Sequence, residues 1–122
     1  MKILLLIFTL STFAFAGFND FECEFNTRSG EHVMVEVEQS FGGATSRVNV
    51  ITDSDRRDYW VSRRYNRGFN EIEYFGGGIR LEIDLWPDTV PRWGRTYRAD
   101  FNSWDIDNNV SYYNINCRYT RI

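Results

Sequence analysis

The sequence predicts an all-β fold, either a small antiparallel β-barrel or a β-sandwich of about eight strands closed by one disulfide. Apolar residues recur with a period of two, which is the spacing of a strand with one buried face. Turn-forming residues separate these segments at short, regular intervals. The two cysteines, Cys23 and Cys117, lie near the two ends of the chain that would remain after residue 16.

Eight segments are expected to form strands. The clearest lies at residues 79–86, where isoleucine and leucine alternate with charged residues. Three further segments show the same alternation, and four weaker ones are rich in valine or aromatic residues. In chain order, the expected strands are 21–25, 32–38, 47–52, 58–65, 69–75, 79–86, 96–104 and 113–119. Glycine, asparagine, aspartate and proline mark the expected connections, which are 27–30, 42–43, 53–55, 66–68, 76–78, 87–94 and 105–109.

The cysteines also constrain the topology. Both lie on the apolar faces of their strands, Cys23 in the first and Cys117 in the last. An even pair in an oxidising compartment is typical of a disulfide. The bond is expected to bring the first and last strands together across the core, which slightly favours a closed barrel over a sandwich.

Residues 1–16 have the pattern of a cleaved signal peptide. Lys2 is followed by an apolar run, and Ala14-Phe15-Ala16 supplies a cleavage site with small residues. The apolar run is shorter than the roughly 20 residues of a membrane-spanning helix. We therefore expect a single all-β domain, residues 17–122, that is secreted or periplasmic and has no membrane span.

The amino-acid composition and the net charge argue against several classes of protein. The chain is 43% hydrophobic and 17% aromatic, which excludes a disordered protein. Its only lysine is Lys2, so the mature chain has 13 arginines against 17 acids, a net charge of 13 − 17 = −4. This charge argues against nucleic-acid binding. With one histidine, we expect no metal site and no cofactor. We expect a monomer or weak oligomer.

The connection at residues 86–95 and its flank carry the strongest candidate site. Exposed tryptophan beside arginine and aspartate is typical of a surface that binds a protein or a carbohydrate. Alternatively, this connection folds over the barrel end as a plug, with its tryptophan rings capping the core and arginines stacked on them. The candidate binding residues are Trp86, Asp88, Arg92, Trp93, Arg95 and Tyr97.

A second cluster joins five arginines with aromatic residues. It could bind an anionic ligand. We expect instead that these arginines pair across the sheet with the acidic residues of the first two strands. The five are Arg56, Arg57, Arg63, Arg64 and Arg67.

Other functions are weaker predictions, and we expect no enzymatic activity. The enzyme alternative is a small hydrolase that uses Asp84 or Asp88 with Glu82, and it requires a concave pocket in which carboxyl groups have raised pKa values. Further alternatives are a structural, envelope-associated protein and a carrier of a small hydrophobic ligand. The segment Asp105-x-Asp107-x-Asn109 matches only the start of a calcium loop, so we expect a hairpin turn there.

Overall fold

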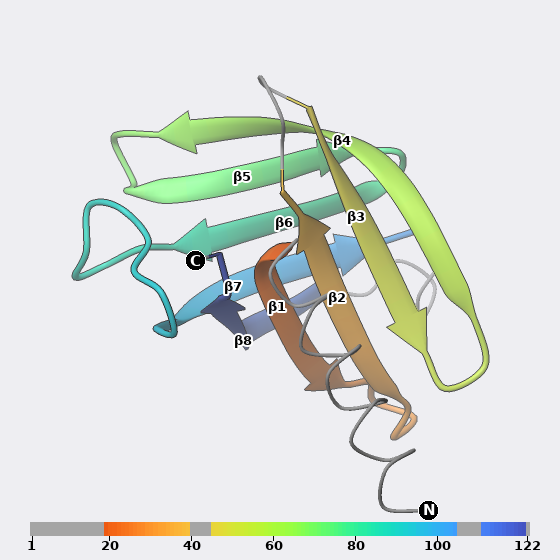
Figure 1. Ribbon diagram of the computed structural model, residues 1–122. Coiled ribbons are helices and arrows are strands. Elements are labelled where there is room, and N and C mark those ends of the chain that lie inside the picture. Colours follow the sequence, from red (N-terminus) through yellow and green to blue (C-terminus); the bar gives the residue numbers. More distant parts are fainter. Residues whose placement is uncertain (1–18, 40–44, 105–110, 122) are drawn as a thin grey trace, which may run out of the picture.

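A computed structural model describes residues 19–39, 45–104 and 111–121 of the chain. Within these residues the protein is all-β, and eight antiparallel strands close into a barrel in which each strand pairs with the next along the chain (Figure 1). The strands are β1 (Asn19–Asn26), β2 (His32–Glu38), β3 (Thr45–Thr52), β4 (Arg56–Asn66), β5 (Glu71–Gly76), β6 (Ile79–Asp84), β7 (Thr96–Ser103) and β8 (Ser111–Tyr119).

Pairing between β1 and β8 closes the barrel and excludes the sandwich alternative. Cys23 lies directly opposite Cys117 in this pairing, with their Cα atoms 4.0 Å apart, and the two form the expected disulfide. The bond therefore joins neighbouring strands at the seam of the barrel. It does not cross the core, which corrects one detail of the sequence prediction. A disulfide in this position is consistent with an oxidising compartment.

The alternating pattern determines which side chains fill the barrel. Residues of β6 show this clearly, because Ile79, Leu81 and Ile83 are buried whereas Arg80 and Asp84 are exposed. The same alternation in β2 buries three valines. The largest fully buried side chains are those of Tyr74, Phe21 and Phe101. The interior is therefore packed mainly with apolar side chains, as expected for a barrel of eight strands.

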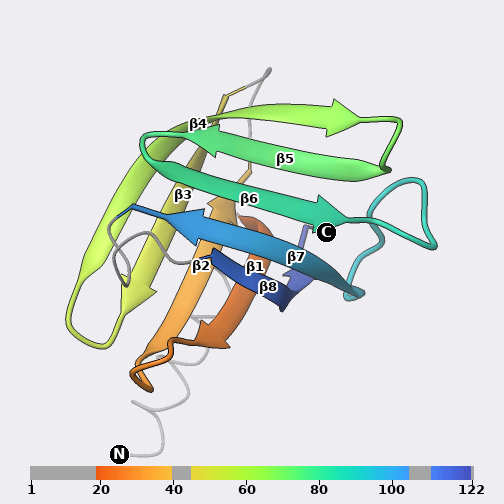
Figure 2. The ribbon, with the colours of Figure 1, turned by 180° about the vertical axis from the view of Figure 1, so that it is seen from behind.

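Seven of the eight expected strands differ from the structure by one or two residues at an end, and the differences in β5 and β6 bear on the candidate site. Strand β6 ends at Asp84, so Leu85 and Trp86 belong to the following loop. Strand β5 begins at Glu71, because Phe69 and Asn70 form the preceding turn, where Asn70 has a positive φ of 53°. The backbone N–H of Leu85 donates to the carbonyl oxygen of Asn70, 3.0 Å away. The two connections therefore lie side by side at one end of the barrel, as Figure 2 also shows.

Within residues 19–39, 45–104 and 111–121, the structure contains no helix of the length and apolar character that crossing a membrane requires. The expected turns at 42–43 and 105–109 lie outside these residues, as does the partial calcium-loop match.

Candidate functional site

The loop between β6 and β7 holds five of the six candidate binding residues, and the sixth, Tyr97, lies in β7. We call residues 85–95 the aromatic loop. It is anchored at its far end to the last strand, because Gly94 N–H donates to the carbonyl oxygen of Tyr119 at 2.8 Å and Tyr119 N–H donates to that of Arg95 at 3.0 Å. The bond between Trp86 and Pro87 is a cis peptide. Together with the hydrogen bond from Leu85 to Asn70, these contacts join the loop to β8 and to the β4–β5 turn.

Asp88 is the central anchor of the aromatic loop. Its side chain is only 8% exposed. The hydroxyl of Tyr97, a buried residue of β7, donates a hydrogen bond of 2.6 Å to Asp88 Oδ2. The same hydroxyl accepts a hydrogen bond from the backbone N–H of Arg92 at 2.9 Å. Burial and the hydrogen bond to Asp88 raise the pKa of Tyr97 above its usual value. The buried carboxylate thus ties both sides of the loop to the barrel.

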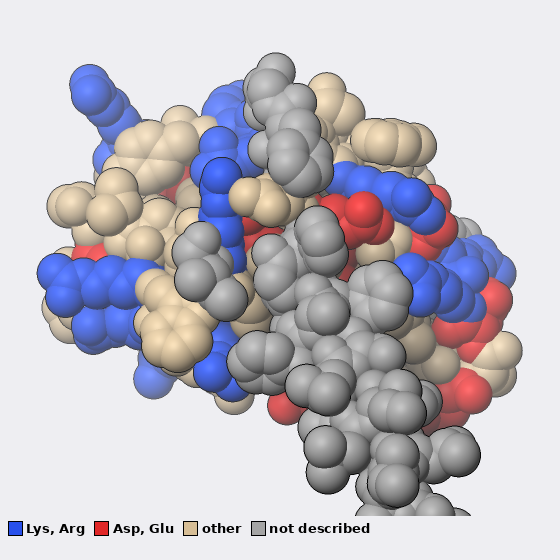
Figure 3. Space-filling model, in the orientation of Figure 1, with Lys and Arg blue, Asp and Glu red and all other residues tan. Residues whose placement is uncertain are grey.

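Two arginines complete this anchor. Arg95 Nε lies 3.3 Å from Asp88 Oδ2, and Arg92 Nε lies 3.6 Å from Oδ1. Both guanidinium groups remain partly in water, because the side chains of Arg92 and Arg95 are 71% and 44% exposed. One carboxylate facing two guanidinium groups leaves a local charge of +1. Figure 3 shows basic side chains gathered at the edge of the molecule where Figure 1 places this loop.

The two tryptophans of the loop are on the surface. Trp86 is 76% exposed and Trp93 is 65% exposed, and Val90 between them is 65% exposed. The rings therefore do not cap the core, and this part of the plug alternative is wrong. A cation–π contact within the described residues joins Arg64 of β4 to the ring of Phe75 of β5, outside the loop. The loop thus uses polar anchors for its own structure and leaves its aromatic rings available.

Sequence reasoning missed one anchoring residue, Asn70. Its Nδ2 donates to the carbonyl oxygen of Asp88 at 2.7 Å, and its Oδ1 accepts from the hydroxyl of Tyr65 at 3.0 Å. The only local signal was the turn at residues 66–68, since asparagine tolerates positive φ better than other residues with a side chain. Its contact with Asp88, 18 residues away, depends on the tertiary fold.

The carboxylates of the hydrolase alternative are divided between two places. Glu82 and Asp84 line a shallow groove of about 210 Å³ on the outer face of the barrel, whereas Asp88 is occupied in the anchor of the loop. Glu71, opposite Asp84 in the β5–β6 pairing, lines the same groove. The required pocket is therefore present only for Glu82 and Asp84. Among the described residues, no three His, Cys, Asp or Glu side chains are arranged to hold a metal ion.

Glu71 is the carboxyl group of the groove with the most altered acidity. Partial burial, a hydrogen bond with Glu82 and the negative charges of Glu82, Glu73 and Asp84 raise the pKa of Glu71 to about 7. Neither Glu71 nor Glu73 was among the candidate site residues expected from the sequence. Their closeness to Glu82 follows from the strand register.

The raised pKa of Glu71 predicts a pH dependence of stability. The folded protein holds a proton on Glu71 that the unfolded chain releases above about pH 4.5, so stability is lost as pH rises from about 4.5 through 7. Because solvent screens this partly exposed group, we expect Glu71→Gln to raise stability at pH 8 by about 1 kcal/mol, or roughly 4 °C in melting temperature. Thermal unfolding at pH 5 is the internal control, where the variant and the wild type should agree. An equal effect at both pH values would contradict the prediction.

The arginine-rich cluster pairs with the acidic strands only in part. Strand β4 lies between β3 and β5. The positive charge of Arg63 nevertheless lowers the pKa of Asp20 of β1, against the larger effect of burial, and Arg56 acts in the same way on Glu36 of β2. Arg64 pairs instead with the buried Glu73 of β5 at 2.9 Å, and Arg57 pairs with Asp55 of the preceding turn at 2.9 Å. Arg57 and Arg64 are therefore neutralised by partners other than those expected, because the sequence reasoning had not established the strand order.

The chain was compared with models of protein families, with curated proteins and with solved structures, and none of the three comparisons found a match. The function must therefore be argued from the fold and the site.

Proposed function

We propose that this protein is an exported, non-enzymatic binding module whose aromatic loop contacts a carbohydrate. The observation that carries the proposal is the exposure of Trp86 and Trp93 on a loop whose backbone is fixed from inside by Asp88. Exposing two large aromatic rings does not stabilise the fold. Flat exposed rings stack on sugars, and nearby guanidinium groups such as that of Arg92 can donate hydrogen bonds to hydroxyl groups.

A protein partner is the second candidate for the same loop. The observation that favours it is the further apolar surface beside the two rings, since Val90 is 65% exposed and Phe69 of the neighbouring turn is 72% exposed. Tryptophan and arginine are also frequent in the energetic centres of protein interfaces. The hydrolase, the envelope-associated protein and the hydrophobic-ligand carrier gain less support from the described residues.

The test applies fluorescently labelled protein to an array of immobilised glycans. We expect binding by the wild type and loss of binding in Trp86→Ala and Trp93→Ala. Both variants should keep their melting temperatures within a few degrees of the wild type, because exposed side chains contribute little to stability. Trp60→Ala is the matched control, since Trp60 is 70% exposed on β4, outside the loop. Retained binding in both loop variants, or unfolding of both, would reject the proposal. An array without signal would reject a carbohydrate ligand and favour the protein partner.

Export with cleavage of the signal peptide also predicts the number of reactive amino groups in the mature protein. Lys2 is the only lysine, so a chain cleaved after Ala16 has one amine, at its N-terminus. We expect an amine-reactive reagent to attach once to the protein purified from the periplasm or medium, as measured by intact mass. Two labels per molecule would show that Lys2 is retained and that the signal peptide is not removed.

A further inference from the structure

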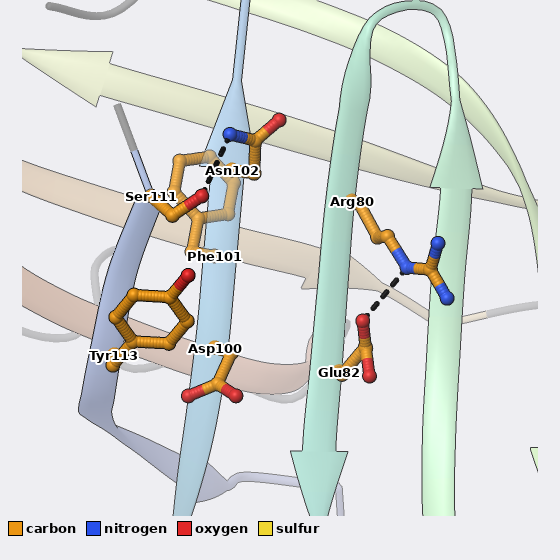
Figure 4. A pocket seen from close by; sticks show the side chains of 7 residues that line it. All are labelled: Arg80, Glu82, Asp100, Phe101, Asn102, Ser111 and Tyr113. Atoms are coloured by element: carbon orange, nitrogen blue, oxygen red, sulfur yellow. Dashed lines mark hydrogen bonds and ion pairs between the residues drawn. The ribbon is translucent and has the colours of Figure 1, made fainter. Parts of the chain in front are cut away.

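A polar groove runs along the outer face of β6, β7 and β8. One part of it has a volume of about 240 Å³ and lies beside the part of about 210 Å³ that holds Glu71. The two parts share Glu82 and Asp100 as lining residues, so they adjoin on this face of the barrel. Figure 4 shows the first part, with Tyr113 of β8 on one side, Asp100 of β7 below, and Arg80 and Glu82 of β6 on the other side.

A bulge in β8 shapes one wall of this groove. Asp100 of β7 faces two residues of β8, Tyr113 and Asn114, because the register shifts between Ala99 and Phe101. Asn114 has a positive φ of 56°, and its N–H donates to Asp100 Oδ1 at 3.1 Å. The bulge leaves the ring of Tyr113 69% exposed. Bulges commonly redirect a side chain beside a binding or catalytic site.

The groove offers hydrogen-bonding groups of every kind along its length. In the first part these groups come from Arg80, Glu82, Asp100, Asn102, Ser111 and Tyr113. From Arg98 to Asn102, the five residues of the strand that forms its floor extend over four residue spacings, or about 13 Å. This length suits a chain of a few linked sugar rings better than a single sugar. The exposed ring of Tyr113 gives one sugar a flat face to stack on.

The charge of the groove limits the kind of sugar. Its two arginines, Arg80 and Arg98, stand against four carboxyl groups, a formal charge of 2 − 4 = −2 when all four are ionised and −1 while Glu71 holds its proton. The positive charge of Arg80 is also partly neutralised within the protein, because its Nε lies 2.7 Å from a carboxylate oxygen of Glu82 and its Nη2 lies 3.3 Å from one of the buried Glu73. A glycan that carries carboxylate or sulfate groups would be repelled. The four carboxyl groups are those of Glu71, Glu82, Asp84 and Asp100.

The groove leads toward the aromatic loop. Asp84, which lines the second part, is the last residue of β6, and its Oδ1 accepts a hydrogen bond from the backbone N–H of Trp86 at 3.0 Å. The exposed Tyr113 therefore lines the groove in its first part, while the exposed Trp86 lies two positions after Asp84 of its second part. We infer that the groove is the binding path for an oligosaccharide of non-acidic hexoses, extending the site from the loop along β6–β8. This inference rests on the proposed function.

The test is a calorimetric titration with three tetrasaccharides: a neutral glucose tetramer, a glucosamine tetramer and a galacturonic acid tetramer. We expect the neutral or amino tetramer to bind and the acidic tetramer to bind at least about tenfold more weakly. Tyr113→Ala should weaken binding about tenfold through loss of the stacking surface. Trp60→Ala, an equally exposed aromatic residue on β4, should bind as the wild type does. Circular dichroism and melting curves should confirm that both variants are folded.

The outcomes separate the two proposals. Wild-type affinity in Tyr113→Ala, with binding still lost in Trp86→Ala and Trp93→Ala, would overturn the groove and leave the loop as the binding surface. Loss of binding in Tyr113→Ala, with wild-type affinity in both loop variants, would support the groove and reject the loop. Equal or tighter binding of the acidic tetramer would overturn the assignment of a non-acidic glycan, as would the absence of binding by all three.

Discussion

Replacing Cys23 and Cys117 together with alanine is expected to lower the free energy of unfolding by about 4 kcal/mol, because the bond joins residues 94 positions apart and removes much of the freedom of the unfolded chain. For a domain of this size the loss corresponds to a fall of roughly 20 °C in melting temperature. The effect should be large here because the bond fastens the β1–β8 pairing, which alone converts an open sheet into a barrel. Urea unfolding followed by circular dichroism measures it.

The control for this prediction is the wild type under reducing conditions. Both cysteines are fully buried, so a reductant should act on the folded protein slowly and on the unfolded protein fast. Once reduced, the wild type should unfold at the same urea concentration as the double alanine variant. If the variant unfolds within about 1 kcal/mol of the oxidised wild type, the disulfide is not what secures the seam.

Removing the carboxylate of Asp88 is expected to have the second largest effect. Asp88→Ala leaves the buried hydroxyl of Tyr97 without its acceptor and the guanidinium groups of Arg92 and Arg95 without their counter-ion. Loss of a buried charged acceptor costs about 2–3 kcal/mol, toward the lower end of the range for buried ion pairs because both arginines reach water. Thermal unfolding measures the loss of stability. Limited digestion with trypsin, which cleaves after arginine, measures whether the loop has opened at Arg92 or Arg95.

Two further variants test the individual contacts of the Asp88 carboxylate. Arg92→Ala removes a side chain that is 71% exposed and should cost less than about 1 kcal/mol. Tyr97→Phe keeps the buried ring but removes the hydroxyl, so its effect should fall between those of the other two variants. Unchanged melting and unchanged resistance to trypsin in Asp88→Ala would show that the loop is held by its backbone contacts alone. The contacts of Asp88 would then not be what fixes the position of the loop that carries Trp86 and Trp93.

The location of the strands and the face that each one buries could be predicted from the sequence. The alternation at Ile79, Leu81 and Ile83 identifies the buried face without any knowledge of the neighbours, because successive side chains of a strand point to opposite sides. The pairing of the two cysteines could also be predicted, since no other partner exists in the chain. The strand ends were less accurate. Whether Trp86 continues β6 depends on the contact of Leu85 with Asn70 in another turn.

The candidate site was identified only in part. Composition placed two tryptophans and several arginines in one connection, and this cluster is real in the structure. The role of Asp88 within it could not be predicted, because its carboxylate accepts a hydrogen bond from Tyr97 of β7 and its backbone carbonyl oxygen accepts one from Asn70 of the β4–β5 turn. The sequence reasoning treated Asp88 as a surface group that could contact a ligand. In the structure Asp88 supports the groups that remain exposed.

The sequence by itself determined the class of fold, the inward face of each strand and the bond between the ends, because these depend on a local period of two and on one available pair of thiols. Only the tertiary structure decided that β4 lies beside β5 rather than beside the acidic strands, that Trp86 and Trp93 face water, and that Tyr113 borders a groove. Those features depend on which distant segments become neighbours when the barrel closes. Register and bulges set that arrangement, and alternation within one strand carries no record of it.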